Sequence, residues 1–168
     1  MNEALLIARV FFGLGMAAHG AQKLFGWFGG YGIAGTGGFM ESLGFRPGKL
    51  FALEAGLGEI TGGLLVALGL LGPVGPALMV SVMLVAAVSV HLHNGFFVTK
   101  NGVEMPLLYA MAALVLAFSG PGAYALDEVM GLADVWSGNT ALIAIGIAVA
   151  GAALNLLSRR VPAAAAKA

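Results

Sequence analysis

The sequence predicts an all-α integral membrane protein, and three observations support this fold class. Of the 168 residues, 60% are hydrophobic and only 10% are charged, whereas about 25% are charged in an ordinary soluble domain. The apolar residues form continuous runs rather than alternating ones, which argues against a membrane β-barrel. Backbone groups in lipid must bond within their own segment, which favours helices. This composition excludes a typical soluble enzyme, a disordered chain and a basic nucleic-acid-binding protein.

Five apolar stretches approach the length of a membrane-spanning helix, which needs roughly 20 residues. In chain order they cover residues 4–25, 49–71, 74–97, 103–119 and 139–157. The first is expected to remain in the protein as a helix, because no basic segment precedes it and Arg9 interrupts its apolar run. The fourth lies at the lower limit of length for a span.

Proline, glycine and asparagine mark the predicted helix ends. Pro47 precedes the second stretch, whereas Pro76 and Pro106 lie near the starts of the third and fourth, where a helix tolerates proline. The Gly-Pro-Gly segment 120–122 ends the fourth stretch. Asn139 is the predicted N-cap of the fifth.

Two loops and a tail complete the predicted organisation. The loop 26–47 is rich in glycine and aromatic residues, and its amphipathic part, residues 38–45, predicts a short interfacial helix. The loop 120–138 is acidic. The tail 161–168 is expected to be a frayed end.

The charged loop residues separate into two groups when five spans are assumed. The basic residues fall on one side, namely Lys23, Arg46, Lys49, Lys100, Arg159, Arg160 and Lys167. The other side carries Glu3, Asp127, Glu128 and Asp134 and no basic loop residue. Lys and Arg are retained on the cytoplasmic side of a membrane. We therefore predict an outer N-terminus, a cytoplasmic C-terminus and an odd number of spans.

Glycine is abundant in the apolar stretches, which predicts close helix packing. The chain contains 27 glycines, among them Gly58 and Gly62 in a GxxxG pattern and Gly13 and Gly15 in the first stretch. Small residues let membrane helices approach each other closely. The expected result is a tight bundle with short loops.

Six ionisable side chains lie at membrane depth, where each costs about 3 kcal/mol or more to insert. They are Arg9, His19, Glu54, Glu59, His91 and His93. Arg9 lies near the predicted outer end and is expected to pair with Asp127, with snorkelling of Arg9 to the interface as the alternative.

The other ionisable groups converge on the predicted inner half of the bundle. His19, Glu59 and His91 lie at comparable depths on three different helices and are the candidate catalytic residues. The candidate ligand-binding residues are Gln22, Lys23, Glu54 and Asn94. Glu54 and Glu59 are five residues apart, about 140° around a helix, so only one of them is expected to point straight inward.

This polar cluster has one structural and three functional interpretations. It forms interhelical hydrogen bonds that hold the bundle together, or it is a proton relay, a quinone headgroup site or a metal site. No sequence-local ligand pattern predicts metal ligands. The absence of cysteine excludes thiolate-held metals and cysteine nucleophiles. No metalloprotease, nucleotide-binding or hydrolase motif is found.

Several motifs occur together between residues 5 and 127. They are His-Gly-Ala-Gln-Lys-Leu-Phe-Gly at 19–26, Gly-Thr at 35–36 with Phe-Met at 39–40, Leu-Gly-Phe at 43–45 with Pro-Gly at 47–48, Glu59 with Gly-Gly-Leu at 62–64, His91 with Asn-Gly-Phe-Phe at 94–97, Glu104 with Pro106, and Gly-Pro-Gly at 120–122 before Leu-Asp at 126–127. In these motifs, and in Arg9, the chain resembles the DoxX family of small bacterial and archaeal membrane proteins.

The resemblance implies a compact four-helix membrane core, here residues 1–127. The chain departs from the family in two respects. It continues through an outer loop, 128–138, into an additional transmembrane helix, 139–158, and a cytoplasmic tail, 159–168. It also has Ala125 where the family often has serine. The predicted fold is a four-helix DoxX-like bundle with a C-terminal fifth transmembrane helix.

Some members of the family resemble subunits of thiosulfate:quinone oxidoreductases, and others are linked to oxidative-stress complexes or to quinone resistance. The resemblance therefore implies a multi-pass protein of the prokaryotic inner membrane and, as the leading hypothesis, a membrane subunit of a quinone-linked oxidoreductase or redox-defence system, with quinone as cofactor. The alternatives are a non-catalytic anchor for a soluble redox partner and a small-molecule permease. The expected partners are the lipid bilayer, a soluble redox protein and further copies of the chain. No binding of nucleic acid is expected.

Overall fold

The computed structural model describes residues 1–160, and all regular secondary structure in that range is helical. Four helices are long and apolar enough to cross a membrane: α1 (Asn2–Phe25), α3 (Gly48–Leu68), the helix Val74–Asn94 and α7 (Gly138–Leu157). The fifth apolar helix, α5 (Glu104–Ser119), has 16 residues and is shorter than these. The predicted all-α membrane fold is confirmed, and α5 is the stretch predicted to be shortest.

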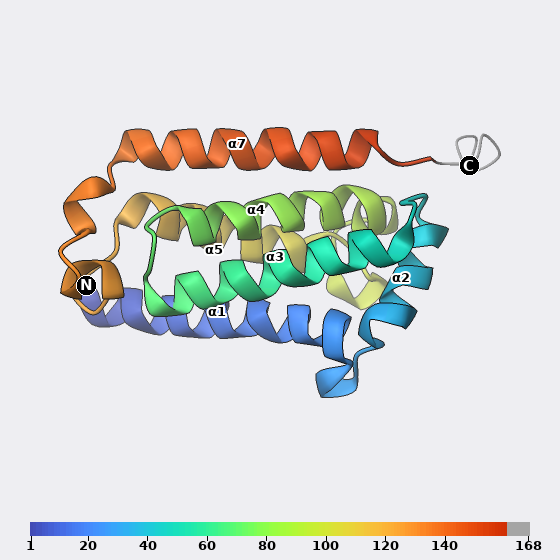
Figure 1. Cartoon of the computed structure of the whole chain (residues 1–168), viewed down its shortest axis with the longest axis horizontal. Helices are drawn as coiled ribbons and strands as arrows, with labels where there is room; N and C mark the ends of the chain where they lie inside the picture. Colours follow the sequence, from blue (N-terminus) through green and yellow to red (C-terminus); the bar gives the residue numbers. More distant parts are fainter. Residues whose placement is uncertain (161–168) are drawn as a thin grey trace.

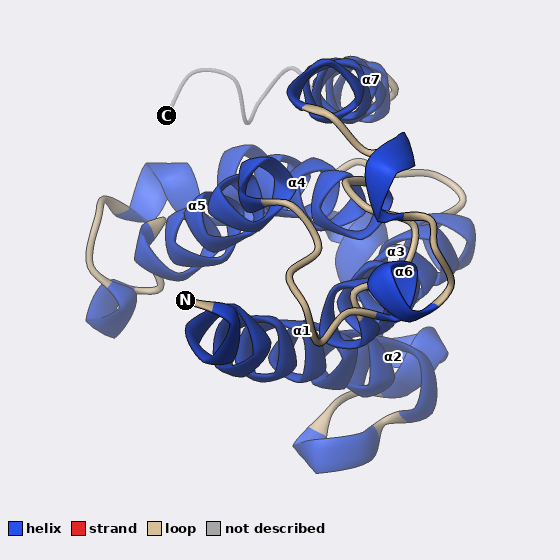
Figure 2. Cartoon of the chain, turned by 90° about the vertical axis from the view of Figure 1, so that its left-hand side faces the viewer, coloured by secondary structure: helices blue, strands red, loops and turns tan. Residues whose placement is uncertain are grey.

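Four of these helices form a closed ring. The helix α1 packs along α3, α3 along α4 (Val74–Ala86), α4 along α5, and α5 returns to α1. Figure 2 shows these four helices from one end of the bundle, with α7 outside them. The helix α7 packs mainly on α4 and touches α5 only slightly (Figure 1). The four-helix core with an added C-terminal helix is therefore confirmed.

Glycine brings α1 and α3 into backbone contact, as the abundance of glycine predicts. A Cβ on Gly13 would lie 2.6 Å from the Gly63 carbonyl oxygen, and a Cβ on Gly20 would lie 2.6 Å from the Gly56 carbonyl oxygen. Gly62 lies on another face of α3, next to Leu78 of α4. The glycines of α3 therefore serve two neighbouring helices.

The ends of several helices differ from the predicted ends. The interfacial helix α2 covers Gly32–Ser42, earlier than the predicted 38–45. The third long helix passes from α4 into a π-helical turn, Ala87–His91, and a 3-10 turn, Leu92–Asn94. It ends three residues before the predicted position because Gly95 has a positive φ of 85°.

The N-cap of α7 is Ser137 and not the predicted Asn139. Ser137 Oγ accepts from the Thr140 amide at 3.3 Å, and Thr140 Oγ1 accepts from the Ser137 amide at 2.8 Å. This reciprocal arrangement satisfies two amides at the helix start, which one cap side chain alone does not.

The two ends of the bundle carry different charges. We call the end where α1 ends and α3 begins the basic end; its segments carry Lys23, Arg46, Lys49, Lys100 and Arg159, together with the acids Glu41 and Glu104. We call the end where α1 begins and α3 ends the acidic end; its segments carry Glu3, Asp127, Glu128 and Asp134. Arg159 Nε donates to the Leu43 carbonyl oxygen at 3.0 Å, which brings the last turn of α7 to the basic end. The predicted frayed tail, 161–168, lies outside the described residues.

Candidate functional site

The centre of the candidate site is an ion pair between α1 and α3, near the basic end. Glu59 is 1% exposed, and the Lys23 ammonium donates to both of its carboxylate oxygens at 2.6 Å. The Lys23 side chain is 27% exposed and therefore connects the buried carboxylate to the surface. A buried charge is costly unless it is paired, so the pair holds both side chains in place.

The close approach of α1 and α3 positions this pair. Lys23 follows Gly20 by three residues on α1, and Glu59 follows Gly56 by three residues on α3. Residues three apart share a helix face, so both charged groups lie on the faces that meet at Gly20 and Gly56. A Cβ on Gly56 would lie 2.5 Å from Leu24 Cγ. Glycine at these positions thus allows a lysine on one helix to reach a glutamate on the other.

Three further polar side chains surround the pair. His19 Nδ1 and Gln22 Oε1 are 3.2 Å apart, and Gln22 Nε2 donates to a backbone carbonyl of the loop after α1 at 3.2 Å. The His19 ring meets the Tyr109 ring of α5 edge to face, with centroids 5.7 Å apart. The predicted residues His19, Gln22, Lys23 and Glu59 therefore lie together.

A pocket opens beside Lys23, between the end of α1 and helix α2. Its volume is about 540 Å³, and its polar lining is Gln22, Lys23 and Thr36, with Tyr31 and Phe39 as aromatic walls. Thr36 Oγ1 donates to the Lys23 carbonyl oxygen at 3.2 Å, which ties α2 to the end of α1. An apolar pocket with a few fixed polar groups is typical of small-molecule binding sites.

His91 and Asn94 lie at a different place, in the irregular end of the third long helix. The Nδ1 atom of His91 lies 2.9 Å from the Asn101 carbonyl oxygen, to which Asn94 Nδ2 also donates at 3.2 Å. Within residues 1–160, neither side chain forms a hydrogen bond or ion pair with Glu59 or Lys23. They share a face, as their spacing predicts, and they bind the loop before α5.

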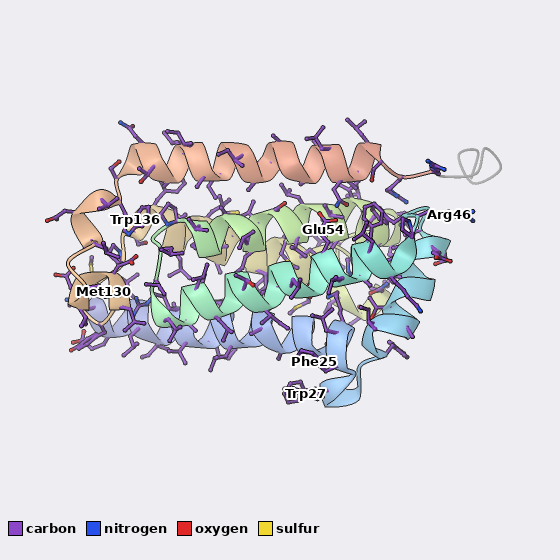
Figure 3. All side chains as sticks on the ribbon, viewed as in Figure 1. Phe25, Trp27, Arg46, Glu54, Met130 and Trp136 are labelled. Carbon is purple, nitrogen blue, oxygen red and sulfur yellow. The ribbon has the colours of Figure 1, made fainter. Side chains whose placement is uncertain are left out.

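Glu54 lies on the opposite side of α3 from the ion pair. Its side chain is exposed, and its Oε1 accepts from Asn155 Nδ2 of α7 at 2.9 Å. Figure 3 shows Glu54 on the side of α3 that faces α7. Only Glu59 of the two glutamates is buried in the core, as their angular separation predicts. Glu54 instead connects the core to the fifth helix.

Arg9 and Asp127 lie in the same region of the acidic end but do not form the predicted ion pair. Arg9 is 4% exposed, so it does not snorkel either. Its Nη1 donates to the Pro121 carbonyl oxygen at 2.8 Å and its Nη2 to that of Tyr124 at 2.9 Å. Asp127 accepts from the Leu71 amide at 3.0 Å. Backbone groups thus take the place that each side chain would have had in a direct ion pair: carbonyl oxygens accept from Arg9, and an amide donates to Asp127.

Three residues that were not among the predicted site residues contribute to these arrangements, and of these only Thr36 belongs to a motif quoted above, Gly-Thr at 35–36. Tyr109 contacts His19, Asn155 binds Glu54, and Thr36 binds the end of α1. Asn155 is a polar residue in an apolar stretch, a feature from which the sequence could have predicted a polar contact inside the membrane. The Gly-Thr motif at 35–36 is the sequence signal for Thr36, whereas Tyr109 has none, because tyrosine is common near membrane interfaces.

Comparison with known proteins identifies a family for the N-terminal half of the chain and a curated relative. A family model described as DoxX matches residues 4–92, which is more than half of the chain. A curated relative, an uncharacterised protein of Haemophilus influenzae, is 38% identical over 84 residues. The match covers 48% of this chain and 63% of the relative, so the chain spans less than two thirds of the relative's length. No solved structure matches significantly.

Proposed function

The chain belongs to the DoxX family of membrane proteins, and from this membership and the Lys23–Glu59 site we propose that it binds a quinone headgroup as the membrane component of a quinone-linked oxidoreductase or redox-defence system. The observation that carries the proposal is the position of Lys23. Its ammonium is fixed by a buried carboxylate at 2.6 Å, and its side chain lines an open pocket of about 540 Å³.

The lining of this pocket suits a quinone. Lys23 and Gln22 offer hydrogen-bond donors to a quinone carbonyl, and Tyr31 and Phe39 offer aromatic faces to the ring. The exposed apolar side chains around α1 and α2 offer a surface for an isoprenoid tail at membrane depth. His91, Asn94 and Glu54 are not needed for this binding, since none of them lines the pocket.

The residues of the site also suit proton transfer. Reduction of a quinone to a quinol takes up two electrons and two protons. Glu59, Lys23 and His19 can exchange protons, and the ion pair gives a route from the pocket to a buried carboxylate. The electrons would come from a soluble redox partner, because the chain has no cysteine to hold an iron–sulfur cluster.

The charge distribution supports an orientation for this site. The basic end would face the cytoplasm of a prokaryotic cell and the acidic end the outside. The pocket between α1 and α2 lies at the basic end, so the quinone headgroup would be reached from the cytoplasmic half of the inner membrane. A soluble partner would then deliver its electrons at this end.

Thermal unfolding of the purified protein tests this proposal. A ligand that binds the folded state raises the transition temperature in a saturable way, and we expect decylubiquinone to do so. Lys23→Met should weaken this binding at least tenfold, because it removes the ammonium but retains the length of the side chain. Lys49→Met is the matched control, since Lys49 lies at the same end outside the pocket.

A second variant separates loss of binding from loss of folding. Tyr31 is 85% exposed and lines the pocket, so Tyr31→Ala should fold normally and still bind decylubiquinone more weakly. The absence of any stabilisation of the wild-type protein, or equal stabilisation of wild type, Lys23→Met and Tyr31→Ala, would contradict the proposal and favour a non-catalytic anchor.

A further inference from the structure

An uncharged segment rich in aromatic residues follows α1 at the basic end of the bundle. Residues 24–40 contain no acidic or basic side chain, and five of them are aromatic. The segment includes the 3-10 turn η1 (Trp27–Gly29) and most of α2. The turn after α1 projects away from the ring of helices in both views (Figure 1, Figure 2). A surface in water usually carries many charges, so this segment is unusual for a loop in solvent.

The aromatic side chains of this turn are exposed and adjoin each other. Phe25, Trp27 and Phe28 are 57%, 58% and 71% exposed, and Figure 3 shows Trp27 outside the ring of helices. The ring centroids of Phe25 and Trp27 are 5.1 Å apart, and those of Trp27 and Phe28 are 6.4 Å apart. We call these three residues the aromatic knob. Large exposed apolar surfaces of this kind mark contacts with a partner or a membrane.

Backbone geometry holds the knob in place. Gly26, with a φ of 74°, ends α1. Gln22 Nε2 donates to the Phe28 carbonyl oxygen at 3.2 Å, and the Gly30 amide donates to the Trp27 carbonyl oxygen at 2.9 Å. Phe28 itself has a φ of 53°, which is unfavourable for a bulky residue and persists only where the surrounding structure imposes it. The exposure of the knob is therefore a defined feature of the fold.

The knob continues the outer surface of α1. This helix is long and apolar enough to cross a membrane, and Ile7, Leu14 and Phe25 are all exposed on it. At 3.6 residues per turn, these three side chains point in directions within about 20° of each other. A stripe that faces lipid along α1 thus runs into the knob without a charged residue between Phe25 and Phe28.

We propose that the aromatic knob lies in the interfacial layer of the bilayer at the basic end, among the glycerol groups and the upper acyl chains of the lipids. Aromatic side chains, tryptophan above all, prefer this layer. Arg46 and Lys49 are exposed at the start of α3, where their charges suit the lipid phosphates. The knob has no charged group with which to recognise a soluble protein, whereas contact with lipid needs none.

Fluorescence of Trp27 gives a direct test, since the chain contains only two tryptophans, Trp27 and Trp136. In the full-length Trp136→Phe variant, reconstituted in phosphatidylcholine vesicles, the emission reports Trp27 alone. We expect lipids brominated near the glycerol end of the acyl chain to quench it at least twofold more strongly than lipids brominated near the methyl end. Aqueous acrylamide should quench it at least threefold less than it quenches N-acetyltryptophanamide.

Spin labels at two exposed positions provide the second measurement. Phe28→Cys places a label on the knob, and Ser42→Cys places one at the end of α2, next to Glu41 and outside the knob. Dissolved oxygen, which concentrates in lipid, should relax the label at position 28 more strongly than a water-soluble nickel chelate does. The label at position 42 should show the reverse order, which makes it the matched control.

Four results would overturn the proposal. They are quenching of Trp27 by acrylamide but not by brominated lipid, stronger quenching by bromine near the methyl end, and greater access of the nickel chelate than of oxygen to the label at position 28. Protection of Trp27 from both kinds of quencher is the fourth, and it would show that a second copy of the chain covers the knob. None of these measurements includes a quinone, so the knob and the quinone site can fail separately.

Discussion

At the scale of single residues, the chain places its charged side chains where other groups already compensate them. Lys23 forms an ion pair with Glu59. Backbone carbonyl oxygens accept hydrogen bonds from the Arg9 guanidinium, and backbone amides donate to Asp127. An ionisable group inside a membrane is expensive and is usually associated with function. These groups gather in two regions, one at each end of the bundle, and the region at the basic end holds the candidate quinone site.

The Lys23–Glu59 pair makes the first prediction. Lys23→Met leaves a buried carboxylate without its partner and should lower the free energy of unfolding by about 3–5 kcal/mol. Adding Glu59→Gln should restore most of this loss, because the second change removes the unpaired charge. Lys49→Met should change stability by less than about 0.5 kcal/mol. Unfolding in mixed micelles measures all three variants, and a double variant no more stable than Lys23→Met would contradict the pairing.

Gly69 makes the second prediction. It has a φ of 64° and lies against the guanidinium of Arg9, where a Cβ would overlap it. Gly131 has a similar φ of 68° but no neighbour within 4 Å of a built Cβ. Gly131→Ala should therefore cost only the backbone strain of about 1–2 kcal/mol. Gly69→Ala should cost at least about 2 kcal/mol more, since Arg9 must also move. Equal losses in the two variants would show that Arg9 is not confined by Gly69.

The sequence was sufficient to select most of the charged residues but not to pair them. Membrane depth identifies Arg9, His19 and Glu59, because each interrupts an apolar stretch. It does not show that Lys23 reaches Glu59, since that contact depends on how closely α1 and α3 approach at Gly20 and Gly56. A pairing across two helices depends on helix rotation and separation, which the spacing along one helix does not determine.

At the scale of helices, α1 and α3 pack more tightly on each other than α7 packs on the core. Backbone contact at Gly13 joins α1 to α3, whereas Gly146 of α7 faces open space. The glycines of α3 thus give the close packing that their abundance predicts, whereas α7 meets the core through its buried alanines, Ala141, Ala148 and Ala152, and not through Gly146. The fifth helix contacts the core mainly through α4 and through the bond from Asn155 to Glu54.

This difference makes the third prediction. Gly13→Ala would bring a Cβ within 2.6 Å of the Ala67 amide nitrogen and should destabilise the protein by about 1–3 kcal/mol, as overpacking does. Gly146→Ala meets no neighbour within 4 Å and should stabilise the helix by up to about 1 kcal/mol. Unfolding in mixed micelles measures both. The same sign of change in the two variants would contradict the difference in packing.

At the scale of the whole molecule, the separation of charge defines two chemically distinct ends. The net charge is zero, yet the acidic loop residues Asp127, Glu128 and Asp134 gather at one end, and Arg159 reaches the other through its bond to Leu43. The sequence was sufficient to assign the charged loop residues to the two ends, because this assignment depends only on the order of the spans along the chain. The irregular turns over Ala87–Asn94 could not be predicted from the sequence, because they depart from the regular helical period.

The orientation makes the fourth prediction. The chain has no cysteine, so a single introduced cysteine reports its own location. In intact cells, a membrane-impermeant maleimide should label Glu128→Cys and should not label Arg160→Cys, because basic loops are retained in the cytoplasm. Permeabilised cells provide the control in which both are labelled. Labelling of Arg160→Cys in intact cells would reverse the orientation.

The central claim, a quinone headgroup between α1 and α2, is tested most directly by cross-linking with a photoreactive azidoquinone. Mass spectrometry of the full-length protein should find the adduct within residues 22–39, which contain the pocket lining. An excess of decylubiquinone should abolish the adduct, and Lys23→Met should reduce it strongly. Adducts scattered over the lipid-facing helices, or an adduct that decylubiquinone does not displace, would contradict the claim.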